Sequence, residues 1–270
     1  MRTCLNTATT RGRPLEDDIR LCGEVGFEGI EIDTGKLDEF LEDGSIPDLR
    51  ALLDESGVDC AGLMAFAFQP FSDAAGKQIE RICTYGPICR ELGGEVLLSF
   101  IAEQPPEEVS RDGAILRAAE VAHHYAVAAA DSGLTLALEP IGGQQFMGGP
   151  EDALEVVEAA DHPGLGIMVD TFHYYKSGVA AEQIAAIPRD RLLIVHINDA
   201  EDLPREQLTD ANRLYPGLGA IPLDEYLEAL RAVGYDGFVS VELFREEYWR
   251  QDHALVVRSC MRHLQEVLGS

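Results

Sequence analysis

The sequence predicts a single-domain (β/α)₈ barrel that spans residues 1–270. Eight short, β-rich apolar runs alternate with longer segments of helical periodicity. Strands that alternate with helices pair in parallel through right-handed crossovers, and eight such units in about 250 residues are the usual size of this barrel. No linker rich in Ser, Gly or Pro divides the chain. The alternative, an open doubly wound sheet, usually carries a G-x-G-x-x-G turn after its first strand, and this sequence has none.

Each element is predicted from a local pattern. The strands are short runs rich in apolar and β-branched residues, and in chain order they are Thr3–Ala8, Gly29–Ile32, Val58–Phe66, Glu95–Phe100, Thr135–Leu138, Gly166–Val169, Leu192–Ile197 and Phe238–Leu243. The helices have apolar residues at helical spacing, and a Pro before them or a Gly after them marks most of their ends. They are Leu15–Val25, Pro47–Glu55, Asp112–Ala130, Glu151–Ala160, Leu223–Val233 and a final helix from about Asp252 to Leu268.

The charge balance restricts the partners. The chain has 21 Lys and Arg against 48 Asp and Glu, a formal net charge of −27. Such a surface repels phosphate backbones and anionic lipids, so we expect a small-molecule substrate and neither a nucleic acid nor a membrane as partner. No apolar run is long enough for a transmembrane helix and no signal peptide is evident, so a cytoplasmic location is expected, with the six scattered cysteines as buried free thiols. The sequence is also compatible with assembly of the chain into a homo-oligomer.

Four consecutive strands finish with a potential metal ligand. These residues are Glu139, Asp170, His196 and Glu242, each after an apolar run. Taken singly, a polar residue at a strand end is more often a helix cap or a solvated charge. Four in succession favour a metal site, because a barrel gathers the carboxyl ends of its strands at one mouth. Three carboxylates and one imidazole suit Mn²⁺, Mg²⁺, Co²⁺ or Zn²⁺.

Three further residues follow these strands. His173 lies three residues after Asp170, on the predicted loop beyond the sixth strand, where an ordinary polar loop residue is the alternative. Arg213 lies on a long predicted loop beyond the seventh strand. There it would neutralise the carboxylates or bind substrate oxygens, unless it forms a surface ion pair. Asp199 would fix the imidazole or Arg213, and a plain loop carboxylate is an equal alternative.

These residues also resemble a known motif. In order they are Glu139, Asp170-x-x-His173, His196-x-x-Asp199, Arg213-x-x-Pro216-Gly217-x-Gly219 and Glu242. The motif resembles that of the sugar isomerase/epimerase superfamily of xylose-isomerase-like TIM barrels. Within it, the segments Cys4–Thr10, Ile30–Ile32 and His196–Pro204 are most similar to the inosose (2-keto-myo-inositol) isomerase branch. The segment Glu139–Gln145 departs from that branch.

The resemblance implies a function and roles for residues. It implies a divalent metal (Mn²⁺, Zn²⁺ or Co²⁺, with Mg²⁺ as a further candidate) held by Glu139, Asp170, His196 and Glu242. The activity implied is isomerisation of a keto-inositol or related ketose through a metal-stabilised enediolate. Glu139 and Glu242 would also move the proton between carbons. The residues expected to orient substrate hydroxyls are Asn6, Glu31, Gln145, His173 and Arg213.

Other functions remain to be distinguished from isomerisation. Within the superfamily the same chemistry would serve a dehydratase or a ketose 3-epimerase. A metal-dependent abasic-site endonuclease is disfavoured, because it needs further histidines from the first half of the chain and residues 1–122 contain none. The charge of −27 is also wrong for DNA. A sugar-binding barrel without activity is disfavoured by the complete set of metal ligands.

Overall fold

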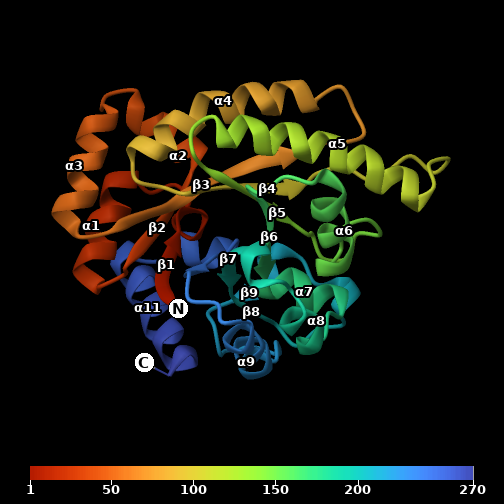
Figure 1. Cartoon of the computed structure of the whole chain (residues 1–270). Coiled ribbons are helices and arrows are strands. Elements are labelled where there is room, and N and C mark those ends of the chain that lie inside the picture. Colours follow the sequence, from red (N-terminus) through yellow and green to blue (C-terminus); the bar gives the residue numbers. More distant parts are fainter. Residues whose placement is uncertain (270) are drawn as a thin grey trace.

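Eight parallel strands close into a barrel in the computed structural model, which describes residues 1–269 (Figure 1). Around the barrel the order is β1-β10-β7-β6-β5-β4-β3-β2, and neighbours in this order are hydrogen-bonded to each other. The last strand in the chain, β10, closes the barrel against the first, β1. The strands are β1 (Arg2–Asn6), β2 (Gly29–Asp33), β3 (Asp59–Phe68), β4 (Val96–Ile101), β5 (Thr135–Glu139), β6 (Leu165–Asp170), β7 (Leu192–Ile197) and β10 (Phe238–Val241). The (β/α)₈ prediction is confirmed, and all eight predicted strands are present.

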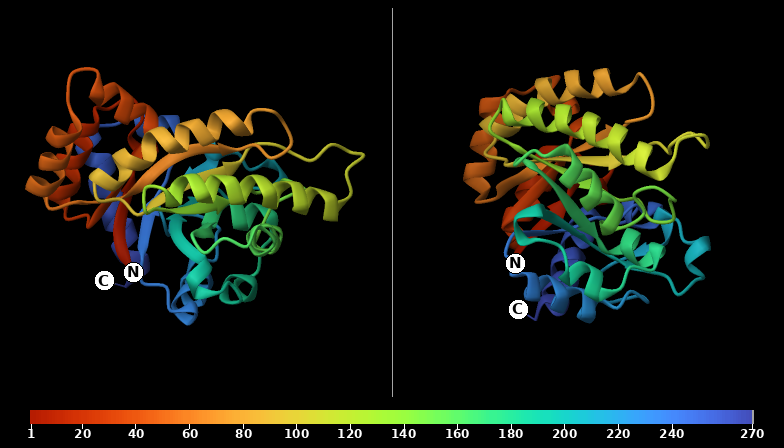
Figure 2. Two further views of the ribbon diagram at one scale, coloured as in Figure 1. Left: turned by 45° about the horizontal axis from the view of Figure 1, so that its top comes forward. Right: turned by 45° about the vertical axis from the view of Figure 1, so that its right-hand side comes forward.

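Helices cover the outside of the barrel. The principal ones are α1 (Leu15–Val25), α2 (Thr34–Leu41), α3 (Ile46–Ser56), α4 (Ala75–Glu91), α5 (Arg111–Ala130), α6 (Pro150–Ala160), α9 (Leu223–Val233) and α11 (His253–Leu268). Figure 2 shows α4 and α5 side by side along one flank of the barrel. The shorter elements are α7 (Thr171–Ser177), α8 (Ala181–Ala185), α10 (Glu246–Trp249), the two-residue strands β8 (Asp199–Ala200) and β9 (Arg213–Leu214), and the 3₁₀ turns η1 (Thr7–Thr10), η2 (Arg189–Arg191), η3 (Arg205–Gln207) and η4 (Asp210–Asn212).

Two of the principal helices have no counterpart among the predicted elements. Helix α4 contains Pro87 within its span, next to Gly86, and both residues are helix breakers that conceal the pattern. Helix α2 is only eight residues long and starts directly after β2, with the Asp33 side chain capping its first amides.

Side-chain alternation places the polar strand ends inside the barrel. Ala137, Met168 and Ile194 belong to an apolar cluster formed mainly by barrel strands. Side chains two residues apart on a strand share a face, so Glu139, Asp170 and His196 point inward, one layer beyond this cluster. The register supports the same placement, because Asp170 pairs directly with His196 across β6 and β7. The interior therefore ends in a layer of ionisable groups at the carboxyl-terminal mouth.

Two further expectations concern the exterior. All six cysteines are free and five are buried, but Cys83 on α4 is exposed, against the expectation that every thiol is buried. Within residues 1–269, no helix is both long enough and apolar enough to cross a bilayer.

Candidate metal centre

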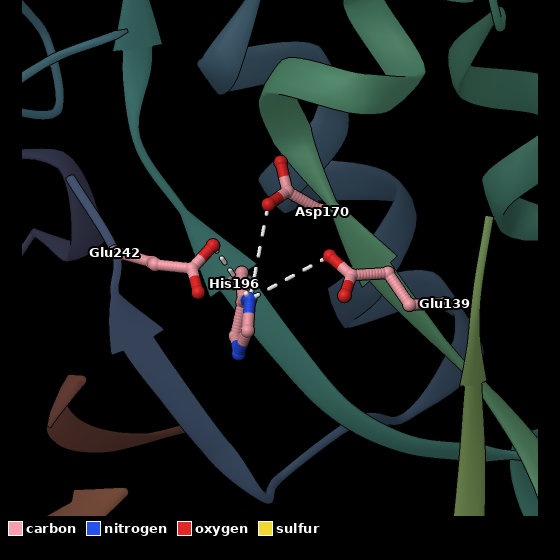
Figure 3. Close-up of side chains that lie close together, drawn as sticks. All are labelled: Glu139, Asp170, His196 and Glu242. Atoms are coloured by element: carbon pink, nitrogen blue, oxygen red, sulfur yellow. Dashed lines mark ion pairs between the residues drawn. The ribbon is translucent and has the colours of Figure 1, made fainter. Parts of the chain in front are cut away.

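The four predicted metal ligands converge at the mouth of the barrel. Each offers one ligand atom, and these four atoms lie within 4.8 Å of one another. The Nδ1 atom of His196 lies 3.1 Å from Oε2 of Glu242, 3.7 Å from Oδ2 of Asp170 and 3.9 Å from Oε1 of Glu139. Figure 3 shows Glu139 and Glu242 on opposite sides of the imidazole, each carboxylate turned towards it. Four strands thus supply a compact cluster of three carboxylates and one imidazole.

Burial makes this concentration of charge costly without a cation. Asp170, His196 and Glu242 are at most 3% exposed, and Glu139 is 9% exposed. Burial raises the pKa of Glu139 well above its usual range, although the His196 charge opposes this, and the Glu242 and Asp170 carboxylates raise it further. Burial also disfavours a charged His196, but the Glu242 and Glu31 carboxylates outweigh it and raise the pKa of His196. The cluster therefore holds onto protons that a divalent cation would displace.

The atoms of the cluster fit a divalent metal. His196 Nδ1 is buried and has no hydrogen-bond partner among the described residues. The other ring nitrogen, Nε2, lies 2.9 Å and 3.0 Å from the two carboxylate oxygens of Glu31. A proton held on Nε2 leaves the lone pair of Nδ1 directed at the three carboxylates, which are hard oxygen ligands. This combination of one imidazole nitrogen and three carboxylates suits Zn²⁺, Mn²⁺ or Co²⁺.

Asn6 and Glu31 lie behind the predicted ligands and outside the cavity at the mouth of the barrel. Both are 0% exposed, and neither lines the cavity at the mouth. Asn6 Nδ2 donates to Glu242 Oε1 at 3.1 Å, and its Oδ1 accepts from the amide of Ala8. Strands β1 and β2 thus place these two side chains against Glu242 and His196 and outside the cavity. The expectation that they orient substrate hydroxyls stays a prediction.

Asn198 contacts two of the predicted ligands and Thr171 supports Asn198, and sequence reasoning missed both. Asn198 Nδ2 lies 3.4 Å from Asp170 Oδ1 and 3.3 Å from the carbonyl of Glu242, and its Oδ1 accepts from the Thr171 hydroxyl at 2.8 Å. Both residues are fully buried. The available signal was their position, since each stands within two residues of a ligand at the end of a strand.

Arg213 is buried against the ligands. It lies on β9, a two-residue strand that pairs with β8, and is 1% exposed. Its Nη1 donates to Asp170 Oδ2 at 2.8 Å and to Glu242 Oε2 at 2.9 Å. Although burial opposes it, this guanidinium holds the pKa of Asp170 well below its usual range. The alternative of a surface ion pair is wrong for Arg213, because its side chain is enclosed.

His173 and Asp199 differ from their expected positions. His173 belongs to the first turn of α7 and not to a loop, because Asp170 Oδ1 caps that helix. Its Nε2 accepts from Arg213 Nη2 at 3.1 Å and lies 3.8 Å from Glu139 Oε1. Asp199 binds neither the imidazole nor Arg213. Its carboxylate accepts from the amides of Gly219 and Ile221, so it fixes the loop that follows β9.

A cavity of about 780 Å³ opens beside the cluster. Glu139, His173, Arg213 and Glu242 line it, together with Gln144 from the loop between β5 and α6. Gln145 does not line it: its side chain is exposed and lines a neighbouring hollow of about 410 Å³, which Gln144 also borders. The structure therefore places Gln144, and not the expected Gln145, in the wall of this cavity, because the loop turns residue 145 outward.

Comparisons with known proteins agree with this geometry. The family model for the xylose isomerase-like TIM barrel matches residues 19–266. An inosose isomerase of Bacillus velezensis is 34% identical over 93% of this chain and 91% of its own length. The inosose isomerase of Bacillus subtilis is 33% identical over the same shares. The crystal structure of an IOLI protein with a bound zinc atom superposes with a TM-score of 0.93 at 30% identity, covering 100% of this chain and 98% of that one.

Proposed function

From the premise that the chain belongs to the xylose isomerase-like TIM barrel family, we propose that it is a divalent-metal-dependent isomerase of a keto-inositol (inosose) or a closely related ketose. The relatives named inosose isomerase, matched over nine-tenths of the chain, support this substrate class. The observation that carries the proposal is the placement of Glu139 and Glu242. Both carboxylates belong to the metal cluster and both also line the cavity.

The reaction needs a base beside a polarised carbonyl. A divalent cation held by Glu139, Asp170, His196 and Glu242 would stabilise the negative charge that develops on the carbonyl and neighbouring hydroxyl oxygens. One carboxylate, Glu139 or Glu242, takes the proton from the carbon that bears the hydroxyl. The proton is returned to the former carbonyl carbon, and the hydroxyl proton moves to the former carbonyl oxygen. The ketone has then moved by one carbon with no net gain or loss of atoms or electrons.

The surroundings of Glu139 suit a proton carrier. Burial raises the pKa of its carboxyl, so the group holds a proton more readily than an exposed glutamate does. Glu242 differs, because Asn6 donates to one of its oxygens and Arg213 to the other. Two donors therefore hold the Glu242 carboxylate in a fixed orientation at the wall of the cavity.

His173 offers a hydrogen-bond donor for substrate, and Arg213 sets the tautomer of its ring. The donors of Arg213 itself face Asp170, Glu242, Asp210 and His173. The Arg213 donor directed at Nε2 of His173 requires a lone pair there, so the imidazole proton is on Nδ1. Burial lowers the pKa of His173, which favours this neutral form. Among the described residues the buried Nδ1 atom finds no partner. We therefore assign it to a substrate oxygen.

The metal proposed first is Zn²⁺, because the structurally similar IOLI protein binds zinc and the cluster contains an imidazole nitrogen. Mn²⁺ and Co²⁺ are the next candidates and Mg²⁺ follows, since it accepts nitrogen ligands less readily.

The test is a proton NMR assay in D₂O with metal-reconstituted protein and a keto-inositol. We expect deuterium incorporation next to the carbonyl and a product ketone at the neighbouring carbon. Absence of both with Zn²⁺, Mn²⁺ and Co²⁺ would overturn the proposal. Loss of water to an absorbing enone would instead indicate a dehydratase, and inversion at a carbon without movement of the ketone would indicate an epimerase.

A further inference from the structure

The loop between β5 and α6 contributes Gln144 to the wall of the cavity, and its side chain is held by Gln104 from the loop between β4 and α5. Gln104 Oε1 accepts from the amide of Phe146 at 3.0 Å. Gln104 Nε2 donates to Gln144 Oε1 at 2.5 Å and also lies 3.1 Å from the carbonyl of Glu103. One side-chain amide therefore joins two loops and contacts the side chain that lines the cavity.

These contacts determine which end of the Gln144 amide is free. A backbone amide only donates, so the N–H of Phe146 requires the oxygen of Gln104 to face it. The nitrogen of Gln104 then faces Gln144, and that nitrogen only donates. Gln144 must in turn present its oxygen to Gln104, which leaves its Nε2 amide free. Among the described residues, Gln144 Nε2 donates no hydrogen bond, whereas its Oε1 accepts from Gln104.

We propose that Gln144 Nε2 donates a hydrogen bond to an oxygen of the bound substrate and that Gln104 is the positioning residue that fixes this orientation. The inference rests on the proposed function for its substrate class, a polyhydroxylated ketone. Because the free Nε2 amide of Gln144 can only donate, it favours a substrate that places an accepting oxygen beside it. Gln144 therefore contributes to specificity through binding. It lies outside the metal cluster, and we expect its effect on KM and not on the proton transfer.

Gln144→Glu is the sharpest variant, because a glutamate keeps an oxygen for Gln104 but presents an acceptor to substrate where the amide presented a donor. We expect KM to rise about tenfold and kcat to stay within about threefold. Gln145→Glu is the matched control: it adds the same charge at the next residue, on an exposed side chain outside the cavity. Its KM should equal that of the wild type. Gln144→Glu kinetics indistinguishable from those of Gln145→Glu would overturn the proposal.

A double-mutant cycle separates positioning from loop stability. If Gln104 acts through Gln144, then Gln104→Leu and Gln144→Ala should each raise KM, and the double variant should be no worse than Gln144→Ala. Full additivity of the two effects would show that Gln104 only supports the loop and would overturn its positioning role. Thermal unfolding of each variant checks that the comparison is made between folded proteins.

A direct signal makes the result independent of turnover. In ¹⁵N-labelled, metal-loaded protein, the side-chain amide resonance absent from Gln144→Ala belongs to Gln144. We expect it to shift in Gln104→Leu without ligand and to shift in the wild type on titration with keto-inositol. Turnover without that second shift overturns this inference and leaves the proposed function standing. The shift without turnover supports this inference and overturns the proposed function. Absence of the shift and of turnover overturns the inference and the proposed function together.

Discussion

His196 Nε2 lies 2.9 Å from Oε2 of Glu31, and both side chains are at most 1% exposed. A metal-binding histidine commonly donates its second ring N–H to a carboxylate, which fixes both the tautomer and the angle of the ring. Here the contact joins β2 to β7 across the interior of the barrel. It leaves Nδ1 as the ring atom that faces the three carboxylates.

Glu31→Gln should therefore weaken metal binding without removing a ligand. An amide oxygen can still accept from Nε2, but it lacks the charge that makes the imidazole a stronger ligand. The expected loss of metal affinity is about 10- to 100-fold, measured by competition with a chromophoric chelator. Glu24→Gln, at an exposed position on α1, is the charge-matched control. Equal affinities in the two variants would show that Glu31 has no part in metal binding.

Removing any of the four ligands should remove the metal. Glu139→Ala, Asp170→Ala, His196→Ala and Glu242→Ala each delete one atom of the cluster. We expect substoichiometric metal by elemental analysis, nearly no turnover, and loss of the increase in Tm that metal gives the wild type. A full equivalent of metal and normal turnover in Asp170→Ala would refute the assignment of the centre.

Glu139→Gln and Glu242→Gln separate ligation from proton transfer. Glutamine keeps an oxygen but is not a base, so metal should be partly retained while kcat falls about 10²- to 10⁴-fold. Deuterium exchange from solvent into the ketose measures the proton step directly. If both variants exchange at the wild-type rate, the base is another group.

The cluster of four potential metal ligands could be predicted because the fold gathers it. Alternation of strands and helices gives the barrel, and the carboxyl ends of its strands meet at one mouth, so Glu139, Asp170, His196 and Glu242 needed only to be recognised as strand ends. The roles of Asn6 and Glu31 were not predictable in this way. A sequence shows that a residue ends or lies within a strand, but not that the barrel places its side chain behind a ligand, out of reach of the cavity.

The loops show the same limit. Whether Gln144 or Gln145 enters the cavity depends on the contact with Gln104, which is 40 residues away in the sequence. Likewise, the burial of Arg213 results from the pairing of β9 with β8, and two-residue strands leave no periodic pattern to detect.

The cytoplasmic location and the oligomeric state stay predictions.

The loop after β9, which Asp199 holds, allows a further test of stability at Gly219. A Cβ atom at Gly219 would lie 2.1 Å from the carbonyl oxygen of Ala200 and 2.6 Å from Asp199 Oδ1. We expect Gly219→Ala to lower the free energy of unfolding by about 1–3 kcal/mol in urea denaturation, since the backbone must move. Gly76→Ala in α4, where nothing lies within 4 Å of the added atom, should show no loss. Equal stabilities of Gly219→Ala and Gly76→Ala would show that the loop accommodates the added methyl group without cost.

The final prediction concerns Arg213, whose guanidinium contacts two of the metal ligands and lines the cavity. In the metal-free protein, Arg213→Met leaves Asp170 and Glu242 without their buried counter-charge, so the free energy of unfolding should fall by about 3–5 kcal/mol. In the metal-loaded protein, metal content should stay near normal, because an arginine donates hydrogen bonds and does not ligate.

The kinetic effect should be separate from that loss of stability. Lysine keeps the charge of Arg213 but not the planar fork that reaches Asp170, Glu242 and His173 together. Arg213→Lys and Arg213→Met should therefore both lower kcat/KM at least about tenfold, which corresponds to about 1.4 kcal/mol of transition-state stabilisation. Steady-state kinetics at saturating metal, below the unfolding temperature of each variant, provide the measurement. Wild-type kinetics in Arg213→Met would mean that the buried guanidinium serves stability alone and that His173 supplies the donor to substrate without it.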